Sequence, residues 1–465
     1  MATQSNHKPL TISIATLGCK VNQYESAALA LSLEIDGYNI IPFLNGDSDI
    51  FIINTCTVTA QADFQCGQII RRAVRSNPHA VVIVTGCYAQ VEPGKIANIP
   101  GVSLIAGNME KQYIPELLKG LLNVQLHHKN ENNDKEAPQN SLLTPKVIVG
   151  NTLQAEPLTF INITKFPGHT RAFLKIQDGC NAQCSYCIVP FARGRSRSLP
   201  IKEALEGIRT LCQHGYREIV LTGIHLGAYG EDLKPSVSLT GLLRAIEKRE
   251  PSARIRLSSI EPLEIGDDLI DFLAQSQHVC PHVHIPLQSG NDDTLVAMGR
   301  HYTVNLFKEL VEKISGRVQG ASIGVDVMAG FPGENELAFE RTRSFIETLP
   351  IAYLHVFPYS KRPGTEAAVF PEQVNDLEKK KRVAILRNLD QQKRHIFAEQ
   401  HVGRRLSVLI EGRTDRQTGW MQGFSENYIP VLISDATSGA LTNCLVMVKA
   451  LEAREGKLIG RIING

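Results

Sequence analysis

The chain has 465 residues, with 49 Lys and Arg against 47 Asp and Glu, so its formal net charge is only +2. This balance excludes a globally basic nucleic-acid-binding protein, and any RNA-binding surface must therefore be local. The contents of 43% hydrophobic and 21% charged residues are those of an ordinary globular protein. A chain of this length corresponds to about two to four domains.

The sequence contains no apolar run near the roughly 18 residues that a membrane span requires. Its N-terminal stretch MATQSNHKPLTISIATLGC also lacks the basic start and the long apolar stretch of a signal peptide. We therefore expect a cytoplasmic protein without a membrane partner. The chain has ten cysteines, and in a reducing compartment clustered cysteines indicate metal or catalytic groups rather than a disulfide framework.

Residues 1–122 alternate apolar runs with helical stretches, which predicts an N-terminal parallel α/β domain. Three β-branched runs each end at a cysteine: TISIATLGC at Cys19, DIFIINTC at Cys56 and AVVIVTGC at Cys87. If these runs are neighbouring parallel strands, the three thiols converge at the edge where open α/β sheets bind ligands. Two interpretations remain open, namely buried structural thiols or a metal cluster with one open position.

Residues 123–165 are polar and lack clear periodicity, which predicts a surface linker or a long loop. Residues 166–400 again alternate strands with helices and predict a parallel sheet, open or closed into a partial (β/α)6 barrel. In such a sheet the functional groups gather at the C-terminal strand ends. The expected strands are RAFLKIQ, EIVLTGI, RIRLSSI, HVHIPL, SIGVDVMAGF and YLHVFPY.

The last part of the chain differs from the preceding blocks in its sequence pattern. Residues 372–400 are highly charged and predict one long helix. Residues 401–465 form short apolar runs separated by turns, a pattern typical of a small β-barrel. Four cysteines outside the two matched sets are expected to be packing residues: Cys66, Cys212, Cys280 and Cys444.

The stretch QDGCNAQCSYCIVPFARGRSRS carries Cys180, Cys184 and Cys187 at C-x3-C-x2-C spacing, directly after the first strand expected in the second block. Thiolates favour zinc, copper(I) and iron–sulfur clusters. Structural zinc usually takes four protein ligands, and the local sequence offers no fourth, although His225 further along is a candidate. Three cysteines instead suit a [4Fe–4S] cluster with one iron open to a non-protein ligand. The spacing favours this second interpretation.

The C-x3-C-x2-C motif inside a repeated βα domain resembles the radical S-adenosylmethionine (SAM) superfamily, and the upstream trio resembles its methylthiotransferase branch. The stretch TLGCKVNQYES from Thr16 to Ser26 is similar to the enzymes that methylthiolate N6-threonylcarbamoyladenosine at position 37 of tRNA, next to the anticodon. Branches that act on isopentenyladenosine or on a ribosomal-protein aspartate typically carry other residues there. The resemblance covers nearly the whole chain and implies a C-terminal TRAM-like RNA-binding barrel.

The resemblance implies two [4Fe–4S] clusters, one on Cys19, Cys56 and Cys87 and one on Cys180, Cys184 and Cys187. SAM would bind the open iron of the second cluster and yield a 5′-deoxyadenosyl radical, which abstracts hydrogen from carbon 2 of the adenine. The first cluster would carry or supply sulfur that another SAM methylates. The implied partners are a tRNA anticodon loop, an electron donor of flavodoxin or ferredoxin type and a sulfur source.

Several polar residues and one glycine at strand ends fit cofactor contacts in this family, although each also suits a local turn or cap. These candidates for SAM binding are Gly223, Ser259, Gln288 and Asp326. Three alternating arginines after the motif suit RNA phosphates or the substrate carboxylate, with an internally paired loop as the alternative. These candidates for substrate and RNA binding are Arg193, Arg195 and Arg197.

Other functions stay open at this point. The same chemistry on N6-isopentenyladenosine of tRNA, or on a ribosomal-protein aspartate, needs the same clusters. A non-catalytic iron–sulfur RNA-binding protein and a zinc-stabilised RNA-binding protein are alternatives of another class. Further RNA-contact candidates are the basic run from Lys379 to Arg382 and Trp420, for which a solvated helix face and a core position are the alternatives.

Overall fold

The computed structural model describes residues 9–43, 48–131, 144–154, 156–434 and 441–463. The chain forms two compact units. The first contains residues 1–157, 179–181 and 187–195, and the second contains residues 158–178, 182–186 and 196–465. Within the described ranges, no helix combines the length and the apolar character that a bilayer crossing needs.

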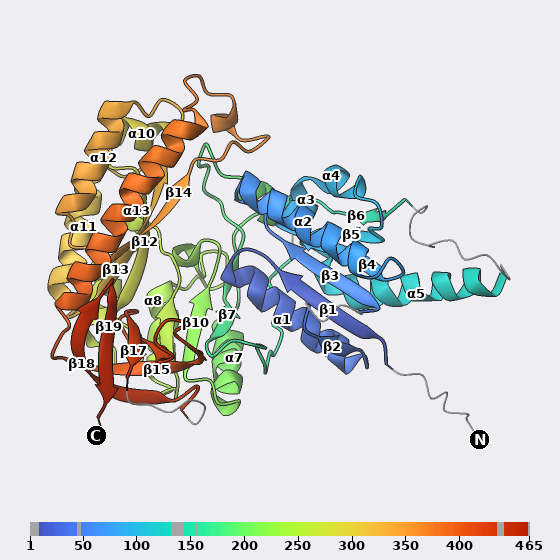
Figure 1. Ribbon diagram of the computed structural model, residues 1–465, viewed down its shortest axis with the longest axis horizontal. Helices are drawn as coiled ribbons and strands as arrows, with labels where there is room; N and C mark the ends of the chain where they lie inside the picture. Colours follow the sequence, from blue (N-terminus) through green and yellow to red (C-terminus); the bar gives the residue numbers. More distant parts are fainter. Residues whose placement is uncertain (1–8, 44–47, 132–143, 155, 435–440, 464–465) are drawn as a thin grey trace. The chain divides into compact units, whose positions relative to one another are not determined.

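The first unit is built on a parallel sheet with the strand order β2-β1-β3-β4-β5-β6 (Figure 1). The three apolar runs that end at cysteines are the neighbouring strands β1, β3 and β4, as predicted from their β-branched residues. The strands are β1 Thr11–Thr16, β2 Asn39–Ile41, β3 Ile50–Thr55, β4 Val81–Gly86, β5 Leu104–Ala106 and β6 Lys146–Ile148.

Helices cover both faces of this sheet because its central strands are apolar on both sides. Helices α1 (Lys20–Ile35) and α5 (Ile114–Glu131) pack on one face, through residues such as Leu33 and Leu118. Helix α2 (Ala60–Ser76) packs on the other face, beside the short helices α3 (Cys87–Val91) and α4 (Pro93–Ala97). The 3-10 helix η1 (Glu110–Tyr113) precedes α5.

Three elements of the first unit lie wholly or partly inside the range predicted as a polar linker, residues 123–165. Helix α5 continues to Glu131, and β6 joins the sheet with Leu104 opposite Lys146. The 3-10 helix η2 (Thr152–Gln154) follows. Three-residue strands and a polar helix end carry little hydrophobic periodicity, which explains why the sequence pattern did not show them. The central part of the predicted linker, residues 132–143, lies outside the described residues.

The second unit contains all six predicted strands in two parallel sets, β11-β10-β7 and β12-β13-β14. An isolated parallel bridge between Ser259 and His284 connects the two sets, so the six strands form the expected partial barrel. The strands are β7 Ala172–Lys175, β10 Glu218–Thr222, β11 Arg254–Leu257, β12 His282–Gln288, β13 Ser322–Ala329 and β14 Tyr353–Pro358. A short antiparallel pair, β8 (Gln177–Asp178) and β9 (Arg197–Ser198), brackets the cysteine motif.

Helices alternate with these strands, and side-chain oxygens cap several of them, for example Ser238 on Gly241 N and Thr303 on Leu306 N. The predicted charged helix is α13. The helices are α7 Ile201–Gln213, α8 Leu239–Glu247, α9 Asp267–Gln275, α10 Asp292–Ala297, α11 Val304–Arg317, α12 Glu336–Thr348 and α13 Asp376–Glu399, with the 3-10 turns η3 Leu226–Ala228, η4 Pro262–Glu264 and η5 Glu366–Ala368.

The C-terminal segment forms the predicted β-barrel, closed in the order β15-β16-β17-β19-β18. A buried ion-pair group attaches it to the partial barrel. Glu218, 0% exposed, pairs with Arg254 and Arg256, and Arg254 donates through its outer nitrogens to backbone carbonyls of the β-barrel at Ser407 and Phe424. The strands are β15 Arg405–Thr414, β16 Met421–Ser425, β17 Pro430–Ile433, β18 Leu445–Arg454 and β19 Lys457–Ile462.

Candidate functional site

The first candidate site lies at the carboxyl edge of the sheet in the first unit. Cys19 precedes α1 just after β1, Cys56 follows β3 directly, and Cys87 is the first residue of α3 after β4. The strand order changes direction between β1 and β3, and open α/β sheets bind ligands at such a switch point. All three are free thiols, and Cys19 is exposed while the other two are buried.

Two glycines with positive φ let the chain segments of this site approach closely. A Cβ at Gly18 (φ +94°) would lie 2.8 Å from the Cys56 sulfur, and one at Gly86 (φ +97°) would lie 2.5 Å from the backbone of Thr55. Each glycine directly precedes a cysteine, Cys19 or Cys87. The sequence around the cysteines therefore permits a convergence that a side chain at either position would block.

The thiols of this site influence one another. Burial raises the pKa of Cys56 to about 11, and the neighbouring Cys87 and Cys19 act in the same direction. Without a metal the Cys56 thiol is therefore protonated at neutral pH, and metal binding must displace that proton. Three converging thiols at a ligand-binding edge fit a thiolate-held cluster. Cys66, on the buried face of α2, is fully buried in the core, as predicted for a packing residue.

The structure places Arg193 in this first site and not on an RNA-binding surface. Helix α6 (Val189–Arg193) belongs to the first unit, and the Arg193 side chain is only 1% exposed. It contacts Cys87 Sγ at 3.3 Å and pairs with Glu25. The predicted RNA contact is therefore wrong for Arg193, and the alternative of internal pairing holds. No local pattern could reveal this, because Glu25 lies 168 residues earlier.

The other two arginines of the run differ from Arg193. Arg195 is exposed, whereas Arg197 is half-buried with its guanidinium 3.6 Å from the Asp178 carboxylate. The three arginine side chains therefore lie in three different environments. Of the three, Arg195 is the one whose exposure leaves it accessible to a phosphate.

The C-x3-C-x2-C motif follows β8, and its three thiols are all partly exposed. Cys180 and Cys187 belong to the first unit, and Cys184 belongs to the second. In the first unit, Cys180 N donates to Gly194 O at 3.0 Å, and a Cβ at Gly179 would overlap the carbonyl of Arg195. In the second unit, Ser185 beside Cys184 donates through N and Oγ to the carbonyls of Met298 and Ala297.

Gly223 follows its strand and lies against a buried glutamine of the second unit. A Cβ there would lie 2.7 Å from Gln177 Oε1, which accepts a hydrogen bond from His225 N at 2.7 Å. The amide of Gln177 donates to Ser196 Oγ at 3.0 Å. Gly223 therefore has a structural reason for being glycine, whatever ligand approaches it. Gln288 also shows unusual backbone geometry, with φ +64° at a register shift in β12.

Asp326 lies in a polar group inside the second unit. It accepts from His284 Nε2 at 2.8 Å and lies 3.4 Å from His355 Nδ1, while His284 Nδ1 contacts the Tyr353 hydroxyl at 3.0 Å. Burial alone would raise the pKa of Asp326, but the two histidines lower it well below its ordinary value. Ser259 is bridged to His284 through the backbone. These two SAM-binding candidates are thus adjacent to one histidine.

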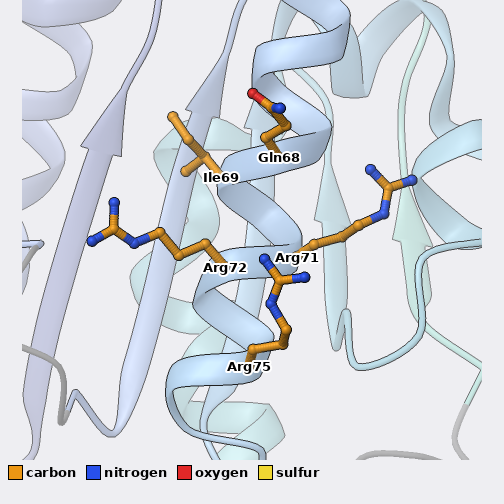
Figure 2. Close-up of a pocket in the computed structure, with 5 residues that line it drawn as sticks. All are labelled: Gln68, Ile69, Arg71, Arg72 and Arg75. Atoms are coloured by element: carbon orange, nitrogen blue, oxygen red, sulfur yellow. The ribbon is translucent and has the colours of Figure 1, made fainter.

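Basic residues proposed for RNA contact are mostly paired. In the run on α13, Lys379 pairs with Asp376, and the buried Arg382 pairs with Glu334. Trp420 is half-buried and directly precedes β16. A shallow hollow in the first unit is lined by five residues of α2, which Figure 2 shows as sticks on one helix: Gln68, Ile69, Arg71, Arg72 and Arg75. This hollow contains no cysteine and lies outside the thiol site.

Comparison with family models gives two matches. Residues 11–107 match an uncharacterised protein family, UPF0004, and residues 174–346 match the radical SAM superfamily. The first range contains Cys19, Cys56 and Cys87, and the second contains the C-x3-C-x2-C motif.

Curated relatives span nearly the whole chain. A threonylcarbamoyladenosine tRNA methylthiotransferase, MtaB, of Bacillus subtilis is 37% identical over 95% of this chain and 94% of its own length. The protein of the same name from Aquifex aeolicus is 36% identical over 91% of this chain and 96% of its own. A tRNA-2-methylthio-N(6)-dimethylallyladenosine synthase of Pelotomaculum thermopropionicum is 31% identical over 96% of both chains.

Among solved structures, the chain is similar to the radical SAM methyltransferase TsrM of Kitasatospora setae, which was determined with cobalamin and a [4Fe–4S] cluster bound. The TM-score is 0.56 at 15% identity, over 78% of this chain and 77% of that one. The cobalamin-dependent SAM radical enzyme OxsB matches with a TM-score of 0.50 at 12% identity, over 83% of this chain and 56% of its own. At these identities the likeness concerns the fold.

Proposed function

Because the chain belongs to the radical SAM methylthiotransferase family that includes MtaB, we propose that it methylthiolates N6-threonylcarbamoyladenosine at position 37 of tRNA. The observation that carries this proposal is the 37% identity to an MtaB over 95% of the chain. Relatives named for the dimethylallyladenosine reaction are less similar, at 31% and 30%. The product is 2-methylthio-N6-threonylcarbamoyladenosine.

Six cysteines are proposed to hold the two [4Fe–4S] clusters. The convergence of Cys19, Cys56 and Cys87 at one sheet edge supports the first cluster, and the C-x3-C-x2-C spacing supports the second. When bound, the clusters and SAM supply the radical and the sulfur that the reaction needs. The protein positions these groups, and its thiols lose their protons on metal binding, since only thiolates are good ligands.

Three of the residues proposed to bind SAM lie at or near strand ends of the partial barrel, namely Gly223, Ser259 and Gln288, whereas the fourth, Asp326, lies inside β13. The two histidine partners of Asp326 keep its carboxylate ionised and oriented. Glu261 pairs with the buried Arg300 at 2.8 Å, which supports a structural role for that carboxylate. For substrate or RNA binding we retain Arg195 and Arg197.

The remaining parts of the proposal concern partners and organisation. The C-terminal barrel, residues 401–465, is proposed as a TRAM-like module that binds the tRNA anticodon loop. Residues 1–122 and 166–400 are proposed as the methylthiotransferase and radical SAM domains, joined through residues 123–165. The reaction requires a reductant, proposed as a flavodoxin or ferredoxin, and a sulfur source. We place this chemistry in the cytoplasm, where tRNA is modified.

The test is mass spectrometry of nucleosides from total tRNA of a strain that lacks the gene, with and without the gene restored. We expect 2-methylthio-N6-threonylcarbamoyladenosine to disappear and return. Loss of the 2-methylthio isopentenyl nucleoside instead would assign the chain to the other tRNA reaction. If no methylthio nucleoside changes, the assignment fails. A chain with Cys180→Ala should not restore the product, whereas one with Cys212→Ala, outside both motifs, should.

A further inference from the structure

The sulfur of Cys87 faces a buried guanidinium. Arg193 Nε donates to Cys87 Sγ at 3.3 Å, Nη1 donates to Glu25 Oε1 at 2.5 Å, and Nη2 donates to Asn22 Oδ1. Both Asn22 and Glu25 lie in the first turns of α1, the helix that Cys19 precedes. A guanidinium presents five N–H donors in a rigid fork, so one side chain serves all three partners at once. Its orientation toward the sulfur is thereby determined.

A second donor approaches the same sulfur. Asn108 Nδ2 lies 3.6 Å from Cys87 Sγ and donates to Ala192 O at 2.7 Å. Its Oδ1 accepts from Lys111 Nζ at 3.1 Å, and Lys111 in turn pairs with the Glu25 carboxylate. Asn108 follows β5, the strand beside β4, which places it at the same carboxyl edge as the cysteine. The Cys87 sulfur thus has one charged and one neutral N–H donor.

These contacts also hold the segment that follows the radical SAM motif. Helix α6 begins two residues after Cys187 and ends at Arg193. Arg193 and the Asn108 bond to Ala192 attach this helix to the first thiol site, and Thr152 Oγ1 donates to Phe191 O at 3.1 Å. The segment from Cys187 to Arg193 therefore carries a ligand of one proposed cluster and a donor to a ligand of the other.

We propose that Arg193 is a positioning residue of the first cluster, whose hydrogen bond to the Cys87 sulfur raises the reduction potential of that cluster. This inference rests on the proposed function, because it requires a cluster on Cys19, Cys56 and Cys87. Reduction adds one negative charge to the cluster, so a cationic donor on a ligand sulfur stabilises the reduced state more than the oxidised state. Hydrogen bonds to sulfur and local charge are established determinants of such potentials.

The experiment is an anaerobic redox titration followed by electron paramagnetic resonance, on the full chain with the three cysteines of the radical motif replaced by alanine. This background leaves the first cluster as the one observed. We expect Arg193→Met to lower the midpoint potential, and a tenfold change in the reduction equilibrium corresponds to about 59 mV for one electron. Glu25→Gln should raise the potential, because it removes the anion that offsets Arg193. Arg72→Met, on the exposed face of α2 in the same unit, is the matched control.

The opposite signs separate electronic tuning from simple support of the fold. If Arg193 only holds α6 in place, Arg193→Met and Glu25→Gln should both reduce iron content and leave the midpoint potential unchanged, which would overturn the proposal. Should Arg193→Met fail to fold, Asn108→Ala removes the neutral donor to the same sulfur, and it too must lower the potential. An unchanged potential in that variant then counts against the role.

Failure of the proposed function gives a different result. A parent chain that binds no iron at the first site overturns both proposals. A second outcome is that the variants show the predicted potential shifts while the tRNA nucleosides remain unchanged in the deletion strain. That result supports the role of Arg193 and refutes the methylthiotransferase assignment. The titration needs no tRNA substrate, so the two readouts are independent.

Discussion

Gly86→Ala offers a sharp test of how the first thiol site is built. Gly86 has φ +97° and ψ −167°, a combination that is essentially restricted to glycine. Holding another residue there costs on the order of 1–3 kcal/mol. The added Cβ would also lie 2.5 Å from both N and O of Thr55, which are backbone atoms of the neighbouring strand and cannot rotate away. We therefore expect at least that loss of stability, and displacement of Cys87 from Cys56.

The assay is urea unfolding of the full chain, followed by circular dichroism, together with the iron content after anaerobic reconstitution. Gly94→Ala is the matched control, because Gly94 lies in α4 of the same unit and an added Cβ there would have nothing within 4 Å. Alanine suits a helix better than glycine by about 0.5–1 kcal/mol, so the control should be neutral or more stable. Equal unfolding midpoints and iron contents for Gly86→Ala and the wild type would refute the reasoning.

Burial and charge lead to the remaining predictions. Glu218→Gln should destabilise the second unit by about 3–5 kcal/mol, measured by urea unfolding, because it leaves two arginines without their buried partner. The control is Glu206→Gln, which removes an exposed ion pair on one helix and should change the stability little. Burial alone would raise the pKa of Glu218, but the arginines lower it, so this stabilisation exists above the unfolded pKa of about 4.3 and disappears as pH falls below it. The thermal midpoints of wild type and Glu218→Gln should therefore converge in acid, and a constant gap down to about pH 3 would contradict this. Cys56→Ala should halve the iron bound per chain, whereas Cys66→Ala should leave the iron content unchanged. If an iron assay shows equal losses for the two variants, the assignment of Cys56 as a cluster ligand and of Cys66 as a core residue is wrong.

The sequence predicted the elements whose signal is strong and local. A β-branched run that ends at a cysteine marks both a strand and its carboxyl end, so β1, β3 and β4 and the convergence of their thiols were predictable. The strands β5 and β6 have three residues each, too few to show a period, and β6 follows a long polar stretch. They are strands because a neighbouring strand supplies their hydrogen bonds, which is information that no local window contains.

The arginines after the radical motif show the same limit for the site. Their alternation does not show which side chains find partners. Arg193 is buried because Glu25, Asn22 and Cys87 come from distant segments of the first unit. Burial of a charge is tolerated only where such partners exist, so the outcome depends on tertiary packing. The sequence does contain the partner, Glu25, six positions after Cys19. Its pairing with Arg193 can be inferred only once α1 and α6 are known to contact each other.

The arrangement of the first unit also explains why a guanidinium suits this position better than an ammonium. Arg193 must donate to a sulfur, a carboxylate and an amide oxygen that come from two separate elements, and these acceptors require donors at fixed mutual angles. A lysine ammonium also has three N–H donors, but they radiate from a single nitrogen, whereas Arg193 reaches its three acceptors through three separate nitrogens. Because Lys111 already pairs with the same carboxylate, a lysine at position 193 would keep the charge near Glu25 but lose direction toward Cys87. Arg193→Lys should therefore preserve the fold better than Arg193→Met. It should still lower the reduction potential of the first cluster. A wild-type potential in Arg193→Lys would show that the positive charge alone, without the directed hydrogen bond, is sufficient.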